Sequence, residues 1–319
     1  MGNGRHQLAV LGAVLIASSA QAQDQGSWTK KAPLPAAINE MQLVFAAGKL
    51  HALGGGVLGY TGPYHQEYDI RNDKWRPLAR VPRSLDHTGA AELNGKIYLF
   101  GGFIGGGTHV DGQPSAFEYD PSLNTWRLLA PMKAGRGSPG VAAVDGKIYV
   151  IGGRDQTGKT VNTNSAYDPA TNTWKDDLAP LPKARDHLAI GVIDGKIHVA
   201  GGRFGASTDP TNEHDIYDPK TNTWTSGPPM PTKRSGLAGT VYKGLFMVLG
   251  GEVPTERRTN TENEAFDPKT NSWRTLSPMP MGRHGTNAAT DGEHVYLVGG
   301  SHLPGGGDVT NELVVFTLP

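Results

Sequence analysis

Short apolar runs recur along the chain and alternate with turn-forming residues. Runs such as 96–100 and 147–151 are rich in β-branched and aromatic residues, and each follows an Asn-Gly or Asp-Gly pair. Such a pair between two β-rich runs is the strongest short-range signal for a hairpin. The segment before the turn, for example 140–144, supplies the first strand. The pattern therefore predicts short strands joined by tight turns.

The same pattern repeats six times. Gly-Gly pairs that end an apolar run are separated by 47, 51, 49, 49 and 49 residues. They begin at Gly54, Gly101, Gly152, Gly201, Gly250 and Gly299. The six Trp residues are separated by 47, 51, 48, 50 and 49 residues. Because two residue types with different physical roles share one period, we expect six copies of one structural unit.

Each unit contains the signals for four strands. After the glycine pair, a loop leads to a strand that ends in an aromatic residue, and in the first five units a Trp follows seven residues later. The last such aromatic, Phe316, is followed by only three residues, whereas Trp28 has no such strand before it. Segment 27–33 is therefore expected to complete the last sheet. A ring closed in this way leaves no long exposed sheet edge.

The glycine pairs, the spaced Tyr and Trp, and the turn D-P-x-T-N-T-W resemble the kelch family over residues 27–319. The resemblance implies an all-β, six-bladed kelch β-propeller with four antiparallel strands per blade, closed by the N-terminal strand joining the last blade. In such a fold the glycine pairs let blades pack closely, while Trp and Tyr fill the gaps between sheets. The function stays open, because kelch propellers include peptide-binding domains, lectin-like modules and enzymes.

Residues 1–22 have the order of a secretory signal peptide. An Arg precedes the apolar run 8–17, and Ala20-Gln21-Ala22 provides a cleavage site. We expect cleavage after Ala22, a mature propeller of residues 23–319, and a periplasmic or secreted bacterial protein without a membrane span.

Charge and cysteine content exclude several classes of partner and site. The chain has 30 basic and 30 acidic side chains, so no attraction for nucleic acid is expected. It has no Cys, which excludes disulfides, thiolate metal sites and cysteine nucleophiles. The 44 Gly and 23 Pro fit the many turns that a ring of short strands requires.

Chain direction places the short, regular turns on one face and the longer, variable loops on the other. Variable chemistry therefore belongs to the second face. Sixteen residues before the glycine pair, where the innermost strand begins, four units carry Arg: Arg136, Arg185, Arg234 and Arg283. Directly after the pair, two units carry Arg154 and Arg203.

We expect these six arginines to form an electropositive mouth that binds an anionic small molecule, a glycan or an acidic peptide. Guanidinium groups bind carboxylate and phosphate through two parallel hydrogen bonds. The resemblance points the same way, since arginines at these repeat positions bind an acidic peptide in the kelch domain that senses oxidative stress. The alternative is structural: an Arg before the inner strand bonds to backbone or to a neighbouring acid.

Histidines and acids accompany the arginines. His87 and His187 each follow an Asp, and His284 follows Arg283. A residue next to another on a strand faces the opposite side, and alternate blades of a wide ring rarely bring imidazoles within 2.0–2.1 Å of one ion. We therefore expect structural hydrogen bonding, with no metal site and no cofactor. Glu40 and Glu252 are the candidates for proton transfer.

Three functions remain open at this stage. The first is a binding protein that uses the arginine-rich mouth. The second is an enzyme similar to the periplasmic kelch epimerase and mutarotase of sialic acid (N-acetylneuraminate), with Arg203 beside Glu252 or Glu40. That enzyme has long insertions between blades, which this sequence lacks. The third is a structural protein-interaction module. Copper radical oxidases are excluded, because their cofactor needs a Cys.

Overall fold

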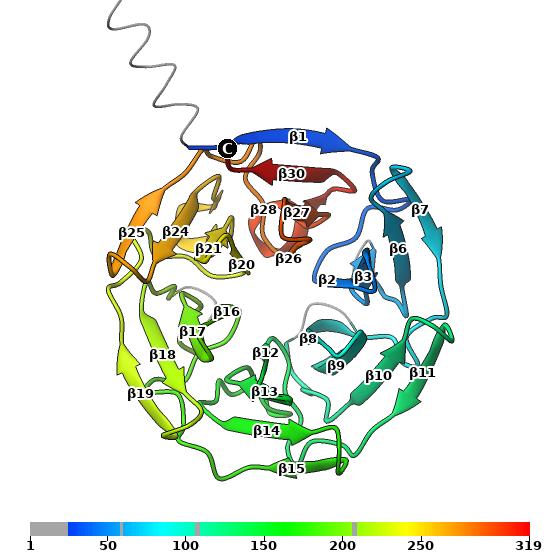
Figure 1. The fold of residues 1–319 in the computed structure, drawn as a ribbon, viewed down its shortest axis with the longest axis vertical. Coiled ribbons are helices and arrows are strands. Elements are labelled where there is room, and N and C mark those ends of the chain that lie inside the picture. The colour runs from blue at the N-terminus through cyan, green and yellow to red at the C-terminus, as the bar shows by residue number, and fades with distance from the viewer. Residues whose placement is uncertain (1–24, 58–59, 106–108, 206–208) are drawn as a thin grey trace, which may run out of the picture.

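A computed structural model describes residues 25–57, 60–105, 109–205 and 209–319. The predicted signal peptide, residues 1–22, lies outside these ranges. Six four-stranded antiparallel sheets surround one axis, like the blades of a propeller (Figure 1). The described residues contain two short 3-10 turns, η1 (Pro254–Glu256) and η2 (Pro304–Gly306), and none of their helices is long and apolar enough to cross a membrane.

Each blade runs from an innermost strand outward. Blade 1 contains β2 (Gln42–Ala46), β3 (Lys49–Leu53), β6 (His65–Asp69) and β7 (Lys74–Pro77). Blade 2 contains β8 (Asp86–Leu93), β9 (Lys96–Phe103), β10 (Ala116–Asp120) and β11 (Thr125–Leu128). Blade 3 contains β12 (Gly140–Val144), β13 (Lys147–Ile151), β14 (Asn164–Asp168) and β15 (Thr173–Lys175).

The second half of the ring repeats this order. Blade 4 contains β16 (Ala189–Ile193), β17 (Lys196–Ala200), β18 (His214–Asp218) and β19 (Thr223–Ser226). Blade 5 contains β20 (Ala238–Tyr242), β21 (Leu245–Leu249), β24 (Asn263–Asp267) and β25 (Ser272–Thr275). Blade 6 contains β26 (Ala288–Thr290), β27 (Val295–Val298), β30 (Leu313–Thr317) and, from the other end of the chain, β1 (Ser27–Lys31).

The ring closes as the sequence predicts. Strand β1 lies beside β30 at the rim (Figure 1) and pairs with it antiparallel. In this pairing Trp28 is opposite Phe316. The two rings are 5.1 Å apart. Segment 27–33 therefore supplies the fourth strand of the last blade, and the six-bladed fold with four antiparallel strands per blade is confirmed.

The glycine pairs stand where neighbouring blades come closest. Gly101 has φ +70°, and a Cβ on it would lie 2.1 Å from the carbonyl oxygen of Arg136 in the next blade. Gly102 donates its N–H to the same carbonyl at 2.8 Å. A side chain at Gly101 would therefore push the two blades apart, which explains the Gly at this repeat position.

A Tyr, an Asn and a Trp that recur in the repeats also connect each blade to the segment before it. The indole Nε1 of Trp126 donates to the carbonyl oxygen of Ala79 at 2.9 Å. Asn124 Oδ1 accepts from the hydroxyl of Tyr119 at 2.8 Å and from the N–H of Ala79 at 2.9 Å. The Tyr, Asn and Trp of the repeat thus satisfy backbone groups between blades while their rings fill the gap.

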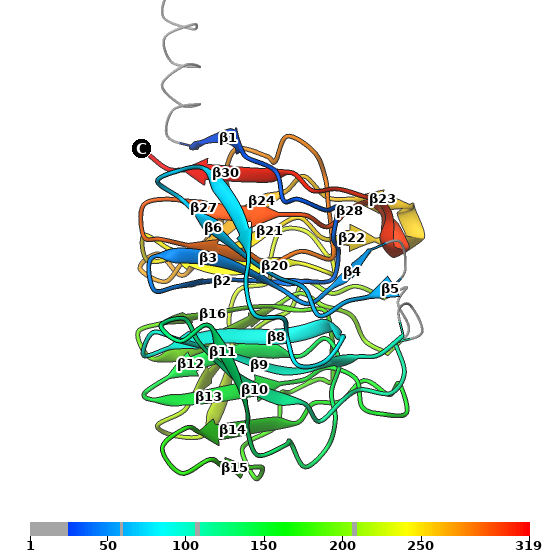
Figure 2. The same cartoon turned by 90° about the vertical axis from the view of Figure 1, so that its right-hand side faces the viewer.

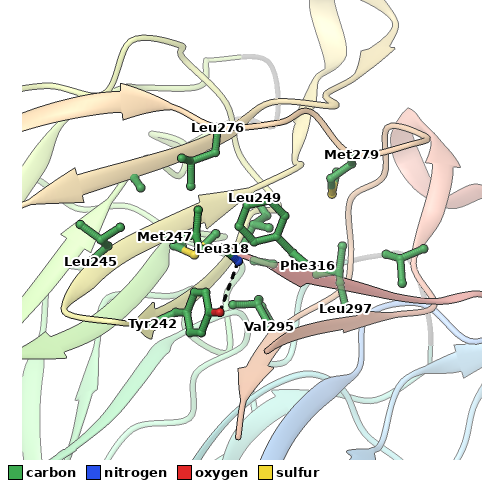
Figure 3. Close-up of a cluster of buried hydrophobic side chains, with 14 residues drawn as sticks. Tyr242, Leu245, Met247, Leu249, Leu276, Met279, Val295, Leu297, Phe316 and Leu318 are labelled. Carbon is green, nitrogen blue, oxygen red and sulfur yellow. Dashed lines mark hydrogen bonds between the residues drawn. The ribbon is translucent and has the colours of Figure 1, made fainter. Parts of the chain in front are cut away.

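Apolar side chains from adjacent blades interlock between the sheets. Between blades 5 and 6, residues including Leu249, Leu297 and Phe316 form one buried cluster (Figure 3). At its edge the N–H of Leu318 donates to the hydroxyl of Tyr242 at 3.3 Å. This contact fixes the C-terminal end of the chain against blade 5.

Three extra hairpins follow glycine pairs and project from one face of the disc (Figure 2). They are formed by β4 (Gly56–Val57) with β5 (Tyr60–Thr61), β22 (Glu252–Val253) with β23 (Arg258–Thr259), and β28 (Ser301–Leu303) with β29 (Gly307–Val309). We call this side the mouth face. It is the side to which the sequence assigns the variable loops.

Candidate functional site

A closed ring of six backbone hydrogen bonds surrounds the axis beneath the mouth face. Its members begin the six blades and all have positive φ, between 52° and 65°. They are Glu40, His87, Ser138, His187, Gly236 and Gly285. Each N–H donates to the carbonyl of the member in the preceding blade, at distances from 2.6 to 3.4 Å. The ring fixes the backbone from which Glu40 and two histidines extend.

The left-handed turn at two ring positions overturns one sequence prediction. On an extended strand, His87 would face away from Asp86. With φ 52° at His87, its Nδ1 instead lies 2.7 Å from Asp86 Oδ1. His187 has φ 54°, and its Nδ1 lies 2.5 Å from Asp186 Oδ1. The expectation that each Asp and its His face opposite sides is therefore wrong, because the backbone is not extended at the His.

Four of the six predicted arginines lie inside the blades. They are Arg136, Arg185, Arg234 and Arg283, and each is at most 4% exposed. Each guanidinium donates to a backbone carbonyl of its own blade. A polar side chain on the third strand, or directly before it in the case of Arg283, completes each set, such as Glu264 Oε2 at 2.7 Å from Arg234. The structure therefore does not bring these four side chains to the mouth, because backbone carbonyls and polar side chains within the blades accept their hydrogen bonds.

Burial disfavours the protonated, charged form of these guanidinium groups. It lowers the pKa of Arg136 to about 10. It also lowers the pKa of Arg234 and Arg283, although Glu264 and Glu312 act in the opposite direction. Their contacts agree with the structural alternative for this repeat position, in which the Arg bonds to backbone or to a neighbouring acid.

Arg154 and Arg203 do reach the mouth, where both contact Asp186. Arg154 Nε donates to Asp186 Oδ2 at 2.8 Å, and Arg203 Nε donates to Asp186 Oδ1 at 3.0 Å. Arg203 also donates to Glu252 Oε1 at 3.2 Å and to His187 Nε2 at 3.0 Å. These two guanidinium groups are therefore parts of a buried network of charges.

Both carboxylates predicted for proton transfer lie in the same network. Glu40 Oε2 is 3.1 Å from His87 Nε2, and its Oε1 is 3.8 Å from His284 Nδ1. Glu252 Oε2 is 3.6 Å from His284 Nε2 and accepts the N–H of Gly305 at 3.0 Å. His284 thus lies between one acid from blade 1 and one acid from blade 5.

Burial and neighbouring charges shift the pKa values of these groups by different amounts and in different directions. Burial alone would raise the pKa of Glu40, but His87 and His284 lower it to about 2. Burial opposes protonation of His87, yet Glu40 and Asp86 raise its pKa above the ordinary value. Burial and the charge of Arg203 hold the pKa of His187 well below that value. The pKa values of two histidines in the backbone ring are therefore shifted in opposite directions.

The network lines a cavity of ≈ 390 Å³ that opens on the mouth face. We call the following ten residues the mouth network: Glu40, Asp86, His87, His109, Arg154, Asp186, His187, Arg203, Glu252 and His284. Four carboxylates face two guanidinium groups, so with neutral imidazoles the network has a formal charge of −2. The expected basic mouth is therefore replaced by an acidic, histidine-rich pocket.

His109 is the site residue that the sequence analysis missed. It lies in the loop between β9 and β10, and its Nε2 is 3.2 Å from His87 Nε2. With His187 these histidines place three ligand atoms within 4.8 Å of one another. The expectation that alternate blades keep imidazoles apart is wrong here. The position fourteen residues before each glycine pair reads Glu, His, Ser, His, Gly, Gly around the ring, which is a signal for Glu40, His87 and His187 but not for His109.

Known proteins resemble this chain in sequence and in fold. A profile of the KLHDC2/KLHL20/DRC7 Kelch-repeats domain matches residues 89–300. Kelch-like protein 35 of Mus musculus is 31% identical over 146 residues, 46% of this chain and 24% of the relative. Kelch repeat and BTB domain-containing protein 12 of Danio rerio is 30% identical over 169 residues, 48% of this chain and 27% of the relative. The matches thus span about a quarter of these relatives.

A solved structure, that of YjhT, superposes with a TM-score of 0.74 at 18% identity, and covers 89% of this chain and 96% of that chain. At this identity the likeness shows the fold alone. The profile match, by contrast, covers most of the described propeller. The chain belongs to the kelch-repeat family.

Proposed function

We propose that this protein binds a saccharide in the cavity lined by the mouth network. The carrying observation is that carboxylates, imidazoles and a guanidinium from blades 1, 2, 4, 5 and 6 converge on one cavity of ≈ 390 Å³. That volume suits a small ligand rather than a folded partner. A saccharide offers many hydroxyl groups, each of which both donates and accepts, and the cavity offers both kinds of partner.

The charge of the network favours a glycan over an acidic peptide. Arg203 is the guanidinium that lines the cavity, and it already contacts Asp186, His187 and Glu252. A run of acidic side chains would meet the four carboxylates of the network and be repelled. A sugar acid, with one carboxylate and several hydroxyls, fits better, since Arg203 faces the carboxylate and the acids accept the hydroxyls.

Exposed apolar side chains on the surrounding loops support ligand binding on this face. Tyr60 is 79% exposed on the β4–β5 hairpin, and Leu303 is 55% exposed at the end of β28. Both hairpins contain or adjoin residues of the cavity, Gly56 and Gly305. An aromatic ring beside a polar pocket suits the apolar face of a sugar ring.

The test is a titration of the chain with a panel of single compounds. The panel contains D-glucose, D-galactose, N-acetylglucosamine, glucuronic acid, N-acetylneuraminic acid and a hexaglutamate peptide. We expect a sugar of the panel to bind, and Glu252→Gln to weaken it. Glu293→Gln, an exposed acid on the opposite face, is the matched control. Binding of the peptide alone, or of no compound, contradicts the proposal.

A second candidate function is the epimerase or mutarotase of a sugar acid. The observation that favours it is a pair of acid–imidazole contacts, Glu40 with His87 and Glu252 with His284. Such pairs provide the proton donor and acceptor that opening a sugar ring requires. NMR in deuterated water tests it: faster interconversion of the anomers of a sugar, or exchange of a carbon-bound proton with solvent, supports an enzyme if Glu40→Gln abolishes it. Binding with neither change supports a binding protein.

We also propose where the protein acts, on the basis of its sequence. The signal sequence expected at residues 1–22 suits a periplasmic or secreted protein. Fractionation of the producing cells, with an antibody against the propeller, tests this assignment.

A further inference from the structure

Three imidazole nitrogens and one carboxylate oxygen converge at the floor of the mouth cavity, and no function described above requires that arrangement. His87 and His187 extend from the backbone ring, and His109 comes from the loop after β9. Their ligand atoms all lie within 4.8 Å of one another, and Nε2 of His87 is 3.2 Å from Nε2 of His109. Two nitrogens bound to one zinc ion at 2.0–2.1 Å lie about 3.3 Å apart in tetrahedral geometry.

From this convergence we propose that His87, His109 and His187, with Glu40, bind one divalent transition-metal ion. Imidazole nitrogens with a single carboxylate suit Zn²⁺, Co²⁺, Ni²⁺ and Cu²⁺ rather than Mg²⁺ or Ca²⁺, which prefer oxygen ligands alone. Glu40 supplies the oxygen, because its Oε2 lies 3.1 Å from His87 Nε2. The inference goes beyond saccharide binding and does not depend on it.

Two aspartates orient the histidines as outer partners of a metal site do. Asp86 Oδ1 accepts from Nδ1 of His87, and Asp186 Oδ1 accepts from Nδ1 of His187. Each bond leaves Nε2 as the nitrogen on the side of the convergence point, where His187 Nε2 also contacts Arg203 NH2 and Ser138 Oγ. Histidines that bind metals almost always donate their other N–H in this way, which fixes the tautomer and the ring orientation.

An ion at the convergence point would take the place of a proton between His87 Nε2 and Glu40 Oε2. Because Nδ1 of His87 contacts Asp86, Nε2 is the nitrogen that faces Glu40 Oε2 and His109 Nε2. A cation at this point binds all three atoms. The formal charge of −2 in the mouth network equals the charge that one divalent ion neutralises.

Binding of a metal ion requires Arg203 to lose its hydrogen bond to His187. Its NH2 donates to His187 Nε2 at 3.0 Å, so an ion at His187 replaces this contact. Arg203 keeps two other partners, Asp186 through Nε and Glu252 through NH1. A rotation of the guanidinium about these bonds frees His187 without leaving Arg203 unpaired. The backbone ring holds Glu40 and His87 in place meanwhile.

The test is isothermal titration of the full chain, first dialysed against a chelator, with ZnCl₂. We expect one ion per chain. His87→Gln and His109→Gln should each weaken binding at least about 10-fold. His294→Gln, a partly exposed histidine in the β26–β27 turn, is the matched control and should bind as the unchanged chain does. Equal binding by all four proteins, or no binding by the unchanged chain, overturns the proposal.

Co²⁺ provides a second readout that does not depend on affinity alone. A Co²⁺ ion in a tetrahedral set of three nitrogens and one oxygen gives intense visible absorption, whereas a hydrated octahedral ion gives weak absorption. We expect the intense spectrum for the unchanged chain and for Asp86→Asn, with affinity about 10-fold to 100-fold lower for the latter. A weak spectrum from the unchanged chain would overturn the site. Because His109 lies outside the strands, its variant is expected to fold, which circular dichroism checks.

Discussion

The backbone N–H of Glu40 donates to the carbonyl oxygen of Gly285 at 2.6 Å, and this bond joins the first blade to the last inside the propeller. The outer closure, Trp28 opposite Phe316, joins the two ends of the chain at the rim. The inner closure has a chemical consequence, because it fixes the residue that carries the Glu40 carboxylate. The ring of left-handed residues is thus both a structural closure and the base of the site.

Gly285 is the ring position most sensitive to a side chain. It has φ +62°, and a Cβ would lie 2.4 Å from Glu40 Oε1. We predict that Gly285→Ala lowers the free energy of unfolding by about 1–2 kcal/mol from backbone strain and also displaces Glu40. Gly236→Ala is the matched control, since φ is +65° and its Cβ would approach His284 Cβ at 3.3 Å.

Urea unfolding and zinc titration separate the two effects in these variants. Both variants should lose stability, but only Gly285→Ala should also weaken zinc binding. Equal zinc affinity in the two variants would contradict the link between the ring and Glu40.

The buried Arg234 is expected to support the fold rather than the ligand. Arg234→Leu leaves Glu264 as an unpaired buried charge, which costs about 3–5 kcal/mol. Blade 2 offers the matched replacement, because its equivalents are Leu85 and Phe117. We predict that Arg234→Leu with Glu264→Phe recovers part of the stability. Thermal and urea unfolding measure this, and a double variant less stable than the single one would contradict it.

Two buried histidine pairs make the fold sensitive to acid. His198 Nδ1 lies 3.0 Å from His214 Nε2 in blade 4, and His51 pairs with His65 in the same way in blade 1. Burial lowers the pKa of His198 to about 4 and that of His214 to about 3. The unfolded chain therefore binds more protons below pH 6.5, so the free energy of unfolding falls as pH falls from about 6.5 to 4.

Blade 5 carries Met247 and Asn263 at the positions of the blade 4 pair. We predict that His198→Met with His214→Asn reduces the loss of stability between pH 7 and pH 5, by on the order of 2–4 kcal/mol. Urea unfolding at the two pH values measures the difference. An equal loss in the variant and the unchanged chain would show that this pair does not titrate on unfolding.

The repeat pattern was sufficient to predict the fold. Glycine pairs and tryptophans mark contacts that recur in every blade, so their period gave the number of blades, and the unmatched Trp28 and Phe316 gave the closure. Candidate Glu40, Glu252, Arg154 and Arg203 were also found, since the residues beside the glycine pairs and at the strand entrances lie on the mouth face.

The direction of side chains could not be predicted from the same pattern. Arg136 and its equivalents were expected at the mouth. Their position at the start of a strand does not show that groups within the same blade accept hydrogen bonds from them. The left-handed backbone at His87 and His187 reverses the alternation of an extended strand. His109 lies in a loop whose length is not repeated, so periodicity gave no information about it.

Saccharide binding by a chain with Glu252→Gln, compared with one carrying Arg234→Leu and Glu264→Phe, tests the central claim most directly. The claim is that the mouth network, and not the repeated arginines, forms the functional site. We predict that the sugar identified by the titration panel loses affinity with Glu252→Gln and keeps it with the blade 5 double variant, provided that both proteins fold. Retained affinity with Glu252→Gln and lost affinity with the folded double variant would contradict the account.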